Sequence, residues 1–71
     1  MKLETIEVAV VGTYKTYMYG VRIKNVNDNM LQEMKEHAKL IGAGPFANST
    51  GSVTIWFEKE STRTLFLLRW Q

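Results

Sequence analysis

The pattern of apolar and polar positions divides the chain into one helical segment and several strand-like runs. Between Asn27 and Gly42 the apolar residues recur every three or four positions, which places them in a stripe about 100° wide on a helix of period 3.6. Charged and amide side chains occupy the other side of this helix. The sequence therefore predicts one amphipathic helix that covers one face of a sheet. The stripe consists of Met30, Leu31, Met34, Ala38 and Ile41.

Both ends of this helix carry recognisable signals. Asn27 is a good N-cap because its side-chain oxygen can accept from the first free backbone N–H groups. Val26 and Leu31 have the spacing of a hydrophobic staple. Gly42 suits the left-handed residue that ends a helix, and Pro45 prevents the helix from continuing.

Four other runs alternate between apolar and polar residues with the period of two that is typical of strands. Residues Gly12–Thr13 are the expected turn between the first two, and residues 43–52, rich in Gly, Asn, Ser and Thr, are an expected loop. The four predicted strands cover residues 4–11, 14–25, 52–58 and 63–70.

The order of elements predicts a single α+β domain over residues 1–71, of ββαββ type, with one helix on one face of a four-stranded sheet. The first and fourth strands are apolar on both faces and are expected in the centre, whereas charge and threonine favour the second and third as edges. Strand order 2-1-4-3, the β-grasp arrangement, meets this demand and allows a right-handed crossover. The fully antiparallel orders 2-1-3-4 and 1-2-4-3 are the alternatives.

Composition narrows the class of protein. Seventy-one residues make one domain with a thin core, and the chain has no cysteine to reinforce it. The apolar runs are too short to span a bilayer, and the first residues lack the apolar core of a signal peptide. We therefore expect a soluble, cytoplasmic protein with no membrane partner.

The sequence offers little catalytic chemistry. His37 is the sole histidine, and no spacing suggests the further ligands that a metal would need, so we expect it to pair with Glu33. Residues 42–47 resemble a dinucleotide-binding loop, but a helix precedes them where a strand is required. No nucleophile, base and oxyanion donor can be assembled. We expect a protein that is not an enzyme and holds no cofactor or metal.

The most informative feature is the sheet face opposite the helix, which is predicted to be apolar where a solvated face would be polar. Such a patch indicates an interaction site, and Trp and Arg often anchor interfaces. We expect it to bind a second copy, as a homodimer, or another protein, as do small inhibitors and adaptors encoded by phages and plasmids. The alternative is nucleic-acid binding, with Trp56 stacking a base and the flanking Arg and Lys side chains holding phosphates; the net charge of +2 gives this only weak support. The candidate partner-binding residues are Met18, Arg22, Lys24, Trp56, Leu65, Leu67 and Arg69.

Overall fold

The computed structural model describes residues 1–12 and 14–71, so Thr13 of the expected turn lies outside the described residues. The chain forms a small α+β domain with two helices. The strands are β1 (Lys2–Ile6), β2 (Val10–Val11), β3 (Thr16–Tyr17), β4 (Tyr19–Lys24), β5 (Phe46–Ser49) and β6 (Ser52–Phe57), and the helices are α1 (Asp28–Leu40) and α2 (Glu60–Trp70).

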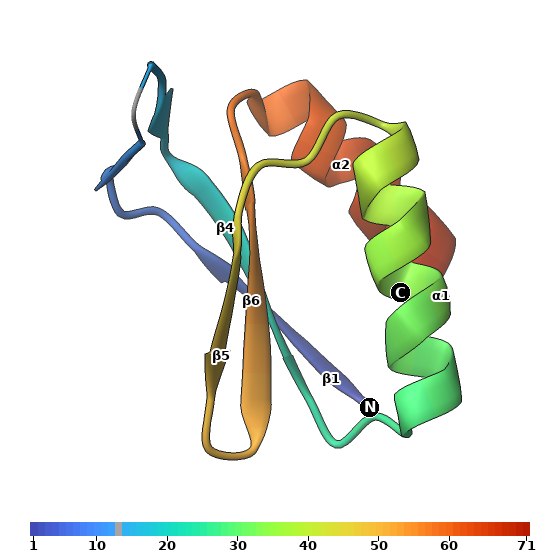
Figure 1. The fold of residues 1–71 in the computed structure, drawn as a ribbon. Coiled ribbons are helices and arrows are strands. Elements are labelled where there is room, and N and C mark those ends of the chain that lie inside the picture. The colour runs from blue at the N-terminus through green and yellow to red at the C-terminus, as the bar shows by residue number, and fades with distance from the viewer. Residues whose placement is uncertain (13) are drawn as a thin grey trace.

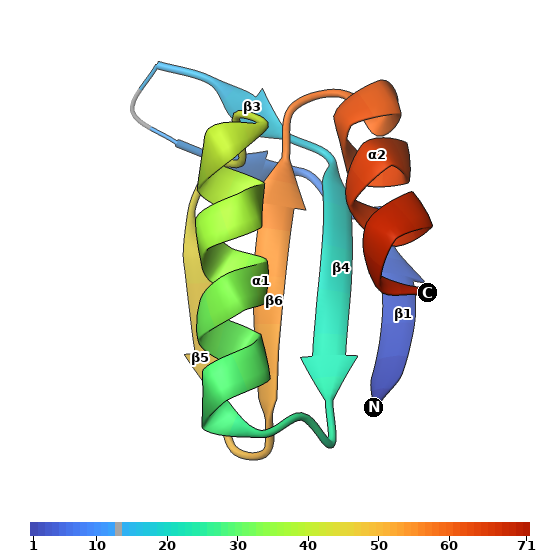
Figure 2. The same ribbon diagram turned by 90° about the vertical axis from the view of Figure 1, so that its right-hand side faces the viewer.

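The molecule has two layers. Strands β1, β4, β6 and β5 form, in that spatial order, an antiparallel sheet. Both helices pack on the same face of this sheet, and the other face carries no helix (Figure 1). The short strands β2 and β3 pair with each other at one end of the sheet. Figure 2 shows α1 lying along β5 and β6 while α2 lies beside β4 and β1.

Helix α1 confirms the prediction for this segment, including its two ends. The Asn27 side chain accepts a hydrogen bond from the Met30 backbone N–H at 2.8 Å. Gly42 has φ of 91°, which favours glycine, and the Ala43 N–H donates to the Ala38 carbonyl at 2.8 Å. These contacts form a C-terminal cap that satisfies carbonyls of the last turn.

The core lies between the sheet and the two helices. Strands β4 and β6 contribute alternate residues to it, and α1 contributes two positions of its stripe. From α2, Phe66 packs against Phe57 with ring centroids 5.6 Å apart. The fully buried side chains of this cluster are Val21, Ile23, Met34, Ala38, Ile55, Phe57 and Phe66.

Helix α2 overturns the prediction of a fourth strand at residues 63–70. Arg63, Phe66, Leu67 and Trp70 recur at the i, i+3, i+4, i+7 spacing of a helix face, and all four are turned at least partly away from solvent. The run of apolar residues here is compatible with the strand period of two and with the helix period of 3.6. The helix period is hard to recognise because the charged residue Arg63 belongs to the buried stripe.

Arg63 is a charged residue on the buried face of α2, and only 6% of this residue is exposed. Its guanidinium donates to the Ile6 carbonyl at 3.4 Å and to the Glu7 carboxylate at 3.1 Å. It also lies 5.2 Å from the centre of the Tyr19 ring. A buried guanidinium must be paired and hydrogen-bonded, so these contacts tie α2 to β4 and to the end of β1.

The β-grasp order 2-1-4-3 is therefore wrong, and so are both antiparallel alternatives, because the fourth position in the sheet belongs to β5 from the predicted loop. β4 and β6 are central, whereas β1 is an edge. The charged residues of β4 lie on its open face and do not indicate an edge strand. Val21 and Ile23 are buried under the helices, and Arg22 and Lys24 alternate with them.

We predict that two neighbouring truncations in α2 change the stability of the protein by very different amounts. Phe66→Ala should lower the free energy of unfolding by about 3–5 kcal/mol because it empties a fully buried site. Leu68→Ala should change it by less than about 0.5 kcal/mol, because Leu68 is 75% exposed. Urea denaturation measures both. A strand would place these two residues on one face, so equal losses would contradict the helix.

Candidate functional site

The helix-free face of the sheet is the candidate site, and its side chains follow from the register. Opposite residues in antiparallel strands share a face, so each row crosses the sheet from β1 through β4 to β6. The register defines three rows. They are Ile6–Gly20–Trp56, Glu4–Arg22–Thr54 with Ala47 of β5, and Lys2–Lys24–Ser52 with Ser49 of β5.

Trp56 holds the aromatic end of this face. Its benzo ring lies over Gly20 on the neighbouring strand, where an added Cβ would stand 2.8 Å from Trp56 Cζ3. Glycine is therefore required opposite the indole. The Trp56 backbone is held by the two residues before β5, since its N–H donates to the Pro45 carbonyl and its carbonyl accepts from the Gly44 N–H at 2.7 Å. The ring is thus fixed in position while remaining partly open to solvent.

The rest of the face is basic. Glu4 lies 3.1 Å from Lys24 Nζ and 3.9 Å from Lys2 Nζ. Hydrogen bonding to Lys24 and the charge of its ammonium hold the pKa of Glu4 below the ordinary value, so Glu4 is anionic at neutral pH. Among the described residues, Arg22 makes no ion pair. Three cations against one carboxylate give this face a formal charge of +2, equal to that of the whole chain.

Hydroxyl groups complete the site at the end remote from Trp56. Ser49 and Ser52 lie opposite each other in the β5–β6 hairpin, with their oxygens 2.8 Å apart. Thr54 is buried in the middle row. The face therefore grades from an aromatic end to a cationic, hydroxyl-rich end, and it contains donors for anionic oxygens and no large apolar patch.

The structure does not bring the seven predicted partner-binding residues together. Arg22, Lys24 and Trp56 lie on the helix-free face as expected, and Met18, which is 49% exposed, directly precedes β4. The other three lie on α2, in the helix layer. Leu65 is exposed, Leu67 packs against the core, and Arg69 stacks over Trp70. The α2 helix carries them away from the sheet face.

Sequence reasoning missed several residues of this face. Lys2 lies outside the first predicted strand, which begins at residue 4, and Ser49 falls in the predicted loop. The importance of Gly20 depends on the register, because only the pairing of β4 with β6 sets it opposite Trp56. The two-residue turn at Thr50–Gly51 between short alternating runs is the signal that could have revealed β5.

A second surface is the arm, which we define as residues 7–12 and 14–18 around β2 and β3. It projects beyond the end of the sheet, on the side away from the helices (Figure 1). Lys15 pairs with Glu58 at 3.2 Å and ties the arm to the end of β6. Val11 and Tyr14 are 80% and 95% exposed, so the arm presents apolar groups that this chain leaves uncovered.

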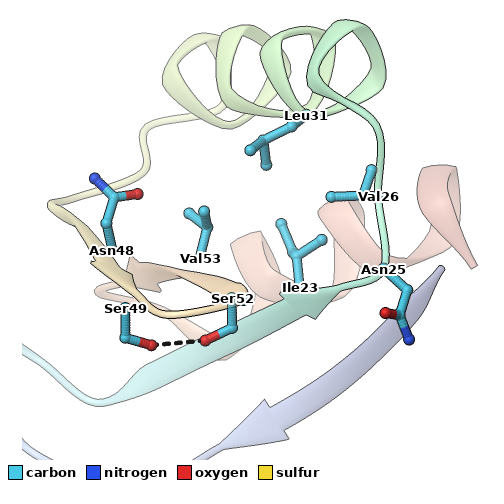
Figure 3. A pocket seen from close by; sticks show the side chains of 9 residues that line it. Ile23, Asn25, Val26, Leu31, Asn48, Ser49, Ser52 and Val53 are labelled. Atoms are coloured by element: carbon cyan, nitrogen blue, oxygen red, sulfur yellow. Dashed lines mark hydrogen bonds between the residues drawn. The ribbon is translucent and has the colours of Figure 1, made fainter.

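A pocket of about 380 Å³ opens on the helix side, between the start of α1 and the β5–β6 hairpin. Ile23, Val26, Leu31 and Val53 converge in it, while the bonded Ser49 and Ser52 side chains point away toward the other face (Figure 3). Its walls offer apolar contact and no charged group.

Several classes of site receive no support from the described residues. No group of three or more His, Asp or Glu side chains among them could hold a metal ion. No helix among them has the length and apolar character that crossing a membrane requires. The sequence-based expectation that His37 pairs with Glu33 is wrong. His37 instead accepts a hydrogen bond from the Trp70 indole N–H.

Comparison with known proteins adds no assignment. No protein-family model, curated protein or solved structure matches this chain.

We predict that Gly20→Ala destabilises the protein through Trp56 alone. The added methyl group overlaps the indole and should cost about 1–3 kcal/mol, as overpacking does. In a Trp56→Ala background the same change should cost almost nothing, because the overlapping ring is gone. A double-mutant cycle by urea denaturation measures this coupling. Additive effects of the two substitutions would contradict the contact between Gly20 and the indole.

Proposed function

We propose that this protein is a small, non-enzymatic module that binds single-stranded nucleic acid on the helix-free face of its sheet. The observation that carries the proposal is the row structure of that face, where Arg22, which makes no ion pair with any described residue, lies between Trp56 and Lys24. Single strands are bound by basic surfaces that hold phosphates and by aromatic rings on which bases stack. Both elements are present on one flat surface.

The position of α2 favours this function over a protein interface on the same face. The sequence-based preference for a protein partner depended on Leu65 and Leu67 lying beside Trp56. Both leucines lie in the helix layer, so the face retains its cations and hydroxyls but loses its apolar character. Protein interfaces are depleted of Lys and Glu at their centres, whereas Lys2, Glu4 and Lys24 form one end of this face.

Each part of the face has a separate role in this proposal. Lys2, Arg22 and Lys24 contact backbone phosphates, and Glu4 keeps the two lysine side chains in place. Trp56, whose ring packs over Gly20, stacks one base. Ser49 and Ser52 are hydrogen-bonded to each other, and the hydroxyl that accepts in this bond donates to a sugar or phosphate oxygen. Neighbouring rows are two residues apart along a strand, about 7 Å, so the three rows accommodate only a few nucleotides.

We predict that affinity for a fluorescein-labelled oligothymidylate falls with salt, with a slope of log K against log salt of about −2 for three phosphate contacts at about −0.7 each. Arg22→Gln should weaken binding and reduce the slope by about 0.7. Trp56→Ala should weaken binding by about 1–3 kcal/mol and leave the slope unchanged, because stacking releases no counterions. Fluorescence anisotropy measures both quantities.

The matched control for these variants is Lys59→Gln, which removes one exposed cation in the turn between β6 and α2, outside the three rows of the helix-free face. It should change neither the affinity nor the slope by as much as Arg22→Gln. Binding that responds equally to both substitutions would be a general charge effect, and the absence of any binding at low salt would refute the proposed function.

A second candidate function is self-association through the arm, supported by the exposure of Val11 and Tyr14. A two-stranded hairpin is marginally stable alone, and pairing with the arm of a second copy would cover its apolar groups. This candidate uses a different surface from the sheet face, so the two can be tested independently.

For this second candidate, light scattering should show that the native mass rises with concentration. The arm variant Val11→Lys with Tyr14→Ser should remain a monomer, because it removes the apolar groups that a second arm would cover. Leu40→Lys, at an 86% exposed apolar position on α1, serves as the control and should behave as the unmodified chain. A monomer at every concentration would exclude the arm as a self-association site.

A further inference from the structure

The contact between the ends of the two helices contains a group whose charge changes near neutral pH. The Trp70 indole N–H donates to His37 Nδ1 at 3.0 Å. Phe66 stacks on the His37 ring with centroids 5.8 Å apart, and the Trp70 ring meets it edge-on at 6.1 Å. His37 therefore packs against two aromatic residues of α2, which also contact each other, and joins the last turn of that helix to α1.

This hydrogen bond requires a neutral imidazole in one tautomer. An indole N–H is only a donor, so Nδ1 must offer its lone pair and the ring proton must sit on Nε2. Uptake of a proton from solvent at Nδ1 converts the acceptor into a second donor. Two N–H groups then face each other at 3.0 Å, and the hydrogen bond is lost.

We propose that His37 and Trp70 form a proton-sensitive latch that holds the last turn of α2 against α1 at neutral pH and releases it when the imidazole gains a proton. The inference does not depend on the nucleic-acid proposal, because the latch lies in the helix layer.

Burial and the charge of Arg69 both disfavour protonation of the imidazole. From α2, the Arg69 guanidinium lies 5.0 Å from the centre of the Trp70 ring, and its positive charge opposes a second cation. On α1 itself, Glu33 lies one turn before His37 and Lys39 two residues after it, and the part of the sheet behind Phe66 is the apolar Phe57. Burial, and then the charge of Arg69, lower the pKa of His37 below the ordinary value.

The sign of the effect follows from this direction. A released His37 has the ordinary pKa of about 6.5 and takes up a proton at higher pH than the latched residue does. The latch is therefore at full strength above pH of about 6.5 and weakens as the pH falls from there through the lower pKa of the latched state. Release turns Trp70 and part of Leu67 toward solvent without moving the sheet.

The direct test follows the two indole N–H signals by NMR from about pH 8 to about pH 5. The Trp70 signal, assigned with Trp70→Phe, should shift with a midpoint below about 6.5, while the Trp56 signal and the backbone amides of the sheet stay in place. His37→Asn places a non-titrating acceptor near the position of Nδ1, and its Trp70 signal should not respond to pH. A Trp70 signal that is constant in the unmodified chain, or that still shifts in His37→Asn, would overturn the latch.

A second measurement keeps the inference testable if His37→Asn does not fold. In Trp70→Phe the imidazole loses its donor and part of its cover, so the His37 pKa, read from its ring proton shifts, should rise toward the ordinary value. An unchanged His37 pKa in this variant would also overturn the latch.

Discussion

The docking of Phe66 into the core is the interaction on which the rest of this structure depends. A 71-residue chain has few large apolar side chains to bury, and Phe66 with Phe57 forms the part of the core between α2 and the sheet. Because Phe66 is buried on the same side of the sheet as α1, the whole segment after β6 lies in the helix layer. The opposite face of the sheet is left without a covering element for that reason.

Arg63 makes this arrangement specific. A buried guanidinium that lacked partners would be costly, and its contacts with Ile6, Glu7 and the Tyr19 ring are available only where β1 ends and β4 begins. The same residue that anchors α2 therefore removes one cation from the surface. The cations that remain together are Lys2, Arg22 and Lys24, on the helix-free face, and this separation of charge gives the face its basic character.

The sequence was sufficient for α1, because Asn27, Gly42 and the apolar stripe are local signals that the structure confirms. It also predicted the alternation in β4 and β6 that sets Arg22 and Trp56 on one side. It failed for α2, because the run from Leu65 to Leu68 is compatible with both periods and the hydrogen-bond partners of Arg63 are more than 50 positions away. The predicted strand order is wrong for the same reason, because it assigns residues 63–70 to a strand of the sheet, whereas these residues belong to α2.

The most direct test of the account is to map the binding surface with an oligothymidylate of about six nucleotides by following backbone amide signals during a titration at low salt. The account predicts that the perturbed amides cluster in β1, β4 and β6 around Arg22 and Trp56, and that the outward positions of α1 and α2 do not respond. Perturbations confined to the helices or the arm, or none at all, would contradict the claim that the uncovered sheet face is the binding site.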